Sequence, residues 1–307
     1  MVLRAFPDLQ WLKGQSEKNF ADRQGWNGRS LPAKGWPSVV LNVKAEDIYR
    51  DNILGPLSIF SNIAGESFVE ADRRRVRIPE GYFYLTNHGQ HYTLEVEKYR
   101  AEVFNIHFGE YFTEQVFSSL IKNPSSLLEE SEFITPLERI SFYNRLHVKG
   151  CAFNNIVREI KTISNNNLLL EEKLYSLIAL LLKDDKQIKR TEAALPALKS
   201  STKKEIIKRL ILATDFIYTH YEKDFSLDDL AKISCLSKFH FLRLFKIAFR
   251  QTPHQFINCV RTAKAQELLK DSSLGVNVIA RRVGFSDPSS FSRMFFNQVG
   301  VYPTQFR

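Results

Sequence analysis

Residues 276–307 read VNVIARRVGFSDPSSFSRMFFNQVGVYPTQFR, and this stretch decides how the end of the chain folds. Its first apolar residues recur at helical spacing and stop at Gly284, which can take the left-handed backbone conformation that ends a helix. A second helix begins within about four residues, because Asp287 is a good N-cap and Pro288 a good first helical residue. The stretch therefore predicts a helix-turn-helix.

The second predicted helix has two different faces. One face is apolar and carries Phe291, Met294 and Phe295. The opposite face carries short or cationic hydrogen-bonding side chains: Ser289, Ser290, Ser292 and Arg293. A face of this composition can enter the major groove of DNA, where such groups meet base edges and phosphates.

The same order of features occurs earlier, in residues 227–256, LDDLAKISCLSKFHFLRLFKIAFRQTPHQF. Leu230 matches Ile279 at an offset of 49, whereas Phe241 matches Phe291 at an offset of 50. The offset of 50 holds for four further residues: Arg243, Phe245, Pro253 and Phe256, which match Arg293, Phe295, Pro303 and Phe306. The turn of the second copy is therefore one residue longer, and the chain is predicted to carry two helix-turn-helix motifs in tandem.

This tandem resembles the DNA-binding domain of AraC/XylS-type bacterial transcription regulators. The resemblance is carried by the one-residue difference between the copies and by the run GFSD...SFSR...F...GVYPTQFR, and it covers residues 204–307. It implies a cytoplasmic, sequence-specific regulator of transcription whose partners are double-stranded DNA and RNA polymerase. A homodimer is a further expectation from the family. An activator is expected too, with a repressor as the alternative that the sequence leaves open.

The predicted DNA-contacting residues lie on or beside two recognition helices. In the first, residues 237–249, the apolar positions face the core and leave the others for DNA. The resemblance implies that Arg243 and Arg293 reach the DNA, where an arginine can hold guanine with two hydrogen bonds or clamp a phosphate. Solvated or ion-paired side chains are the alternative. The full predicted set is Ser237, Lys238, Phe239, Leu242, Arg243, Lys246, Arg282, Asp287, Ser289, Ser290, Ser292 and Arg293.

Three residues depart from the family pattern. Leu242 stands where a small polar residue is common, and it either contacts a thymine methyl group or makes no base contact. Phe296 stands where the first copy keeps Lys246, which puts a phosphate contact of the second copy in doubt. Arg250 replaces the usual glycine, Gly300 in the second copy, so the first recognition helix is expected to end differently.

Length and charge agree with a two-part protein. A chain of 307 residues predicts about two domains. The net charge is +9, and residues 204–307 hold 16 Lys and Arg against 9 Asp and Glu, which suits a polyanionic partner. The three cysteines form no CxxC pair, so neither a disulfide framework nor a zinc site is expected. We expect no membrane anchor, because every apolar stretch is shorter than the roughly 20 residues that span a bilayer.

The N-terminal half has a different pattern. Residues 1–50 look irregular, and their tryptophans Trp11, Trp26 and Trp36 are expected to pack on a neighbouring sheet, or one of them to stack on a ligand. Residues 57–108 are short β-branched or aromatic segments separated by turn residues, which predicts a small antiparallel sheet or barrel. In the family, this half is often a cupin-like barrel that senses a small molecule. Six aromatic residues either line such a site or fill the barrel: Tyr82, Phe83, Tyr84, Tyr92, Phe104 and Phe108.

From residue 111 to 183 the period becomes helical, with a leucine-rich stripe over 168–183 that packs either on its own sheet or on a second copy. The polar residues 184–203 are predicted to be a linker. The predicted fold class is thus α+β. A β-rich, cupin-like sensor or oligomerisation domain (1–183, strand-rich over 57–108 and helical over 111–183) precedes an all-α tandem helix-turn-helix domain (204–307).

An enzyme is not expected. Metal-dependent cupins place two histidines one residue apart, whereas His88 and His91 are three apart and His107 stands alone on a strand. No catalytic Ser/His/Asp set or glycine-rich phosphate loop is recognisable, so we expect no metal and no cofactor. The alternatives are a constitutive regulator without effector, a nonspecific DNA-packaging protein, and a metal-dependent cupin enzyme fused to a DNA-binding domain. The sequence does not identify an effector.

Overall fold

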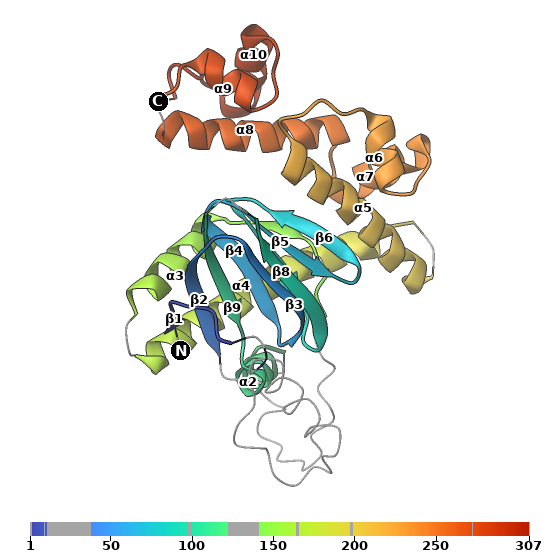
Figure 1. The fold of residues 1–307 in the computed structure, drawn as a ribbon. Helices are drawn as coiled ribbons and strands as arrows, with labels where there is room; N and C mark the ends of the chain where they lie inside the picture. The colour runs from blue at the N-terminus through green and yellow to red at the C-terminus, as the bar shows by residue number, and fades with distance from the viewer. Residues whose placement is uncertain are drawn as a thin grey trace. The chain divides into compact units, whose positions relative to one another are not determined.

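The computed structural model describes residues 2–8, 10, 38–97, 100–121, 141–163, 166–196, 199–271 and 273–306. The chain forms two compact units, Met1–Lys186 and Gln187–Arg307, and each is described by itself. The first is built on β-sheets and the second on helices, as Figure 1 shows. Trp11, Trp26 and Trp36 lie outside the described residues, so their packing stays a prediction.

Two sheets make up the core of the first unit. One has six strands in the order β1-β2-β9-β4-β7-β10, and the other has four in the order β3-β8-β5-β6. Neighbouring strands are antiparallel except for the pair β1 and β2. The strands are β1 (Val2–Leu3), β2 (Val39–Ala45), β3 (Ile48–Gly55), β4 (Ser58–Ala64), β5 (Ser67–Ala71), β6 (Arg74–Ile78), β7 (Tyr82–Thr86), β8 (Gln90–Val96), β9 (Ala101–His107) and β10 (Leu146–Val148).

Strand structure extends beyond the predicted limits of 57–108. Strand β2 and the first three residues of β3 lie in the range predicted to be irregular, and β10 lies within the segment predicted to be helical. The first error arises because β2 is buried on both faces and therefore lacks the polar alternation that marks a half-exposed strand. The second arises because three residues are too few to show any period.

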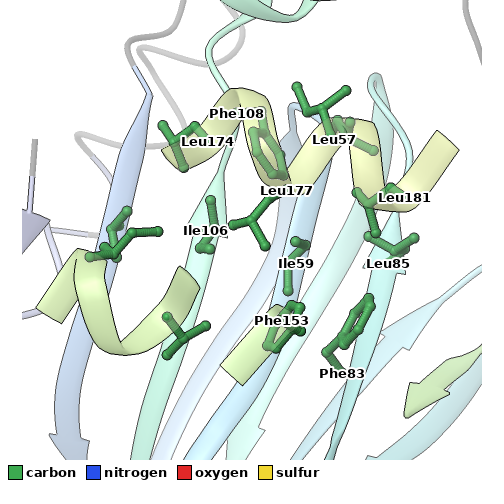
Figure 2. Packing of buried hydrophobic residues seen from close by; sticks show 14 of the residues in the cluster. Leu57, Ile59, Phe83, Leu85, Ile106, Phe108, Phe153, Leu174, Leu177 and Leu181 are labelled. Atoms are coloured by element: carbon green, nitrogen blue, oxygen red, sulfur yellow. The ribbon is translucent and has the colours of Figure 1, made fainter. Parts of the chain in front are cut away.

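Helices cover the outer face of the six-stranded sheet: α2 (Glu110–Ile121), α3 (Cys151–Thr162) and α4 (Asn167–Ala194). Figure 2 shows Leu174, Leu177 and Leu181 of α4 lying over Ile59 and Ile106 of the sheet. Each fully buried leucine contributes roughly 1.5–3 kcal/mol. The leucine-rich stripe therefore packs on its own sheet and anchors α4 there.

Helix α4 continues to Ala194, and α5 (Ser200–His220) begins soon afterwards. Most of the predicted linker, 184–203, is therefore helical. Its lysines, glutamate and alanines are good helix formers, and Ile188 adds one more buried position. Pro196 follows the end of α4, in agreement with the tendency of helices to stop before a proline.

The second unit holds two helix-turn-helix motifs joined by a long helix. Figure 1 shows α8 running between α5–α7 at one end and α9–α10 at the other. The bounds are α6 (Leu227–Ile233), α7 (Lys238–Phe249), α8 (Pro253–Asp271), α9 (Val276–Arg282) and α10 (Pro288–Val299). Four residues separate α6 from α7 and five separate α9 from α10, which confirms the predicted one-residue difference.

The first motif turns at Cys235. This residue has a left-handed backbone with φ of 50°. The N–H of Leu236 then donates to the carbonyl of Ala231 at 3.0 Å, which satisfies a carbonyl at the end of α6.

The second motif turns in the same way at Gly284, where φ is 90°. The N–H of Phe285 donates to the carbonyl of Ala280 at 2.9 Å. The predicted left-handed glycine is thus confirmed, and both motifs share one backbone geometry at the end of the first helix.

The two recognition helices, α7 and α10, end alike but begin differently. Arg250 takes the left-handed conformation after α7 with φ of 56°, as Gly300 does after α10 with φ of 83°. The replacement of glycine by Arg250 therefore does not change the backbone conformation at the helix end, although the N–H of Gly300 also donates to the carbonyl of Phe296 at 2.8 Å. At the start, the carboxylate of Asp287 accepts hydrogen bonds from the backbone N–H groups of Ser289 and Ser290, whereas Ser237 makes no side-chain cap.

This difference predicts unequal effects of two matched substitutions. Asp287→Ala should lower the melting temperature of the protein, because two N–H groups at the start of α10 lose their acceptor, while Ser237→Ala should change it little. Hydrogen bonds from Ser290 and Ser289 hold the pKa of Asp287 below its ordinary value. The cap is therefore fully formed above the ordinary aspartate pKa and is lost as pH falls through the lowered one.

Thermal unfolding followed by circular dichroism measures both effects. Asp287→Asn should keep the cap and remove its acid sensitivity, because an asparagine side chain accepts the same hydrogen bonds without titrating. Equal melting temperatures for Asp287→Ala and Ser237→Ala would contradict the assigned role.

Candidate nucleic-acid interface and the interior of the sheet pair

Helix α7 has one buried face and one exposed face. The buried side chains are Phe241, Leu244, Phe245 and Ala248, which pack within the first motif. On the other face Arg243 and Lys246 are exposed and Leu242 is half-buried. Phe239 has 87% of its surface exposed, the highest value among the exposed large apolar residues of the described chain. The first motif thus presents an apolar and cationic surface.

Lys238 differs from the other predicted contact residues of α7. Its Nζ lies 2.8 Å from Oδ2 of Asp228 on α6, and both side chains are about half exposed. An exposed pair of this kind contributes little to stability. It does place a carboxylate beside the lysine, so Lys238 offers a phosphate less net charge than Lys246 does.

Helix α10 repeats the arrangement with different chemistry. Phe291 and Phe295 are buried against α8 and α9, whereas Ser289 and Arg293 are exposed and Ser292 is half-buried. The hydroxyl of Ser290 donates to Asp287 at 2.7 Å, so its only proton is already used. The exposed face of α10 therefore consists mainly of small hydroxyl groups and one arginine.

In α10 an aromatic pair occupies the position that corresponds to Lys246 of α7. Phe296, the counterpart of Lys246, is 40% exposed and stacks on Tyr302 with ring centroids 4.7 Å apart. The second motif therefore presents an apolar edge there instead of a cation. Arg282 of α9, the remaining predicted contact residue, is exposed near the second turn.

Sequence reasoning missed Arg261, which lies near the middle of α8. Its Nε donates to the carbonyl of Tyr221 at 2.8 Å, and its Nη2 donates to the carbonyl of Lys223 at 3.1 Å. Both carbonyls lie just beyond α5, in the segment that leads into α6 of the first motif. A single arginine in a helix without clear periodicity gives no sequence signal of such a contact.

The six aromatic residues of the N-terminal half are all buried, but they do not share one site. Phe83, Phe104 and Phe108 belong to the apolar cluster under the helices, where the ring of Phe83 stacks on that of Phe153 at 4.4 Å. Alternate residues of a strand point to opposite faces, so Tyr84 of β7 faces the other way, between the sheets. The predicted set is therefore divided between two layers.

The space between the sheets is lined by polar as well as aromatic groups. Phe60 of β4 contacts Tyr92 of β8 across the sheets with ring centroids 4.8 Å apart, and His107 lies beside both. Ser58 donates its hydroxyl proton to the carbonyl of Pro56 at 2.8 Å. His107 Nδ1, 2.9 Å from the same oxygen, must therefore be the donor to Ser58.

His107 is uncharged at neutral pH. Burial, with a smaller effect from the charge of Arg50, lowers its pKa to about 4. In the same row of the sheet, Ser58 is paired with Thr86 of β7, whose buried Oγ1 has no hydrogen-bond partner among the described residues. The Nδ2 of Asn105 is likewise buried and unpartnered within the described part of the chain. A buried polar group without a hydrogen-bond partner costs free energy. Thr86 and Asn105 are therefore suited to form hydrogen bonds with a bound molecule.

Two further observations on the described residues concern metal binding and membrane spanning. Within the described ranges, no group of three or more His, Cys, Asp or Glu is arranged to hold a metal ion. None of the helices that the structure describes is long and apolar enough to cross a membrane.

Known proteins are similar to parts of this chain. A family model described as a helix-turn-helix domain matches residues 230–307. The lactose operon transcription activator of Staphylococcus xylosus is 26% identical over 150 residues, which cover 49% of this chain and 50% of that protein. The Msm operon regulatory protein of Streptococcus mutans is 27% identical over 182 residues, which cover 56% of this chain and 62% of that protein. The chain thus spans between half and two thirds of the length of these relatives.

Among solved structures, the DNA-binding domain of AdpA in complex with a target DNA is 28% identical, with a TM-score of 0.31, over 32% of this chain and 88% of that chain. The family match falls on the tandem motifs, and the relatives named above are regulators of transcription. The C-terminal part of this chain is an AraC-type helix-turn-helix domain, the domain of a family of transcription regulators.

Proposed function

We propose that the chain is a sequence-specific DNA-binding regulator of transcription. The observation that carries the proposal is the repeated division of α7 and α10 into a buried aromatic face and an exposed face with a matched arginine, Arg243 or Arg293. A protein that only packed DNA would need the cations but not two differently composed recognition faces. Activation, contact with RNA polymerase and a homodimer remain part of the proposal through the family resemblance.

The two motifs are proposed to contribute unequally to DNA binding. The basic residues of the helical unit neutralise phosphates and supply most of the affinity. Base discrimination comes from a few side chains on α7 and α10 that reach the groove floor. Lys246 adds a phosphate contact to the first motif that Phe296 cannot add to the second.

The matched arginines give the first test of this proposal. Arg243→Ala or Arg293→Ala should weaken binding to a site selected from random DNA by about 1–3 kcal/mol if the arginine holds a guanine, and should relax preference at one base pair. Arg100→Ala is the control, because this exposed arginine lies in the first unit, paired with Glu46. Binding of each variant to a panel of single-base operator mutants measures both effects. Unchanged affinity and preference in both variants would mean that the recognition helices do not face DNA.

The first motif is proposed to read thymine by apolar contact. Phe239 is 87% exposed and Leu242 is half-buried on the side of α7 that we propose to face DNA, whereas the second motif has Ser292 in place of Leu242. An exposed apolar side chain gains free energy when it covers the methyl group of thymine in the major groove. The hydroxyl groups of α10 instead favour hydrogen bonds.

Uracil tests whether α7 but not α10 contacts thymine methyl groups, because uracil differs from thymine only by the missing methyl group. Replacing a contacted thymine with uracil under α7 should weaken binding about fourfold, since burial of one methyl group is worth roughly 0.8 kcal/mol. The Leu242→Ser variant should lose most of this sensitivity, and uracil placed under α10 should have little effect. Equal sensitivity of wild type and Leu242→Ser at every thymine would refute the assignment.

The first unit is proposed to form a cupin-like sensor whose effector binds between the two sheets. The support is the row that includes Ser58, Thr86 and His107, with Asn105 nearby. In it, Oγ1 of Thr86 and Nδ2 of Asn105 are buried and have no hydrogen-bond partner within the described part of the chain. A neutral, polar small molecule suits it better than a charged one, since burial already keeps His107 uncharged. Such an effector can alter transcription only by binding two arrangements of the molecule with unequal affinity.

Two hydroxyl groups in the row give a matched pair of variants for this test. Thr86→Val should leave thermal stability unchanged or higher, because Oγ1 of Thr86 has no hydrogen-bond partner among the described residues, while Ser58→Ala should lower it by breaking contacts with Pro56 and His107. Operator affinity of the full chain is then measured with and without a small-molecule fraction of cell extract. A response in wild type that is lost in Thr86→Val supports the site, and an equal response in both places the effector elsewhere.

A further inference from the structure

Arg261 lies between the segment that leads into the first motif and the turn of the second motif. On one side its guanidinium holds the carbonyls of Tyr221 and Lys223, which lie between α5 and α6, at 2.8 and 3.1 Å. On the other side its Cζ lies 5.2 Å from the centre of the Phe285 ring, which belongs to the turn between α9 and α10. One side chain of the connecting helix thus contacts both the segment that leads into α6 of the first motif and the turn of the second motif.

The turn of the second motif approaches this contact very closely. A Cβ atom added at Gly284 would lie 2.8 Å from Nη2 of Arg261 and 2.9 Å from the carbonyl oxygen of Glu222. Both distances are shorter than carbon makes with its neighbours in ordinary packing. The backbone of the turn therefore rests directly on the guanidinium and on the chain that follows α5.

The charge and shape of arginine suit this position. Arg261 is about half buried, and burial lowers its pKa, while Asp224 and Glu222 act in the opposite direction. The group stays charged, because arginine loses its proton only far above neutral pH. Its planar fork directs two donors at two carbonyls at once, which the ammonium of a lysine cannot reproduce.

We propose that Arg261 is a positioning residue that fixes α10 relative to α7 and thereby sets the spacing between the two DNA half-sites. The proposal rests on the DNA-binding function proposed above. Helix α10 begins four residues after Gly284, so a displacement of the turn is passed on to its recognition face. Two recognition helices on one side of B-DNA must lie about 34 Å apart, and each added base pair rotates one half-site by roughly 35°. A small change in the angle between the motifs therefore alters which spacing fits.

The experiment measures affinity as a function of half-site spacing. The full-length protein is titrated onto the site selected from random DNA, onto versions whose centre is lengthened or shortened by one or two base pairs, and onto duplexes carrying one half-site. Wild type should bind the selected spacing far better than any altered spacing. A wild-type profile that is flat would overturn the proposal without any variant, and failure to select a preferred sequence would instead refute the proposed function.

Two variants then test the residue itself. Arg261→Lys keeps the charge but loses the fork, and Arg261→Gln loses both; Lys208→Gln removes a charge from an exposed position of α5 and is the control. Both Arg261 variants should bind the selected spacing about tenfold more weakly, the size expected for one lost charge-assisted hydrogen bond, and should show a flatter spacing profile. Their affinity for a single half-site should equal that of wild type.

The remaining outcomes count against the proposal. A spacing profile as steep as that of wild type, with weaker binding throughout, would show that Arg261 contributes charge and not position. Loss of single half-site binding together with loss of helical circular dichroism would assign the residue to folding. Amide hydrogen exchange at Gly284 and Phe285 provides a check, because both amides should exchange faster in Arg261→Lys while those buried within α7 do not.

Discussion

The fold of the helical unit depends on the hydrogen bonds made by the backbone carbonyl groups at the end of the first helix of each motif. A helix leaves its last carbonyls without internal partners, and a left-handed residue lets the following N–H turn back to reach them. Cys235 and Gly284 supply that residue, and the N–H groups of Leu236 and Phe285 make the bonds. The chain reverses there within a few residues, and this reversal brings the aromatic face of each recognition helix onto its own small core.

The cores that result are small and rely on aromatic side chains. In the second motif Phe291 and Phe295 pack with Ile279 and Ala280 of α9 and with the inner face of α8. A motif of two short helices cannot bury enough apolar surface by itself, so the shared helix α8 completes both cores. Because both cores depend on α8, this helix and its side chains determine the position of one motif relative to the other.

Local patterns predict local structure well in this chain. The helices, the left-handed Gly284 and the one-residue difference between the turns all follow from neighbouring residues, and the structure has each of them. The errors concern residues whose environment is set by distant parts of the chain. Strand β2 loses its alternation because helices and sheet bury both of its faces, and Arg250 adopts the glycine-like conformation because the first motif must close as the second does. The division of the N-terminal aromatics between two layers likewise depends on register, which sequence alone leaves open.

The comparison of the two turns shows why a contact can be harder to predict than a conformation. Both turns need a left-handed residue, yet one is a cysteine and the other a glycine. A left-handed backbone alone does not demand glycine, since Cys235 adopts it with its side chain exposed to solvent. Glycine is required at 284 because Arg261 and the carbonyl of Glu222 leave no room for a Cβ atom. The glycine that the sequence marks as a helix end is therefore, in the structure, also the point at which the second motif rests on α8 and on the segment between α5 and α6.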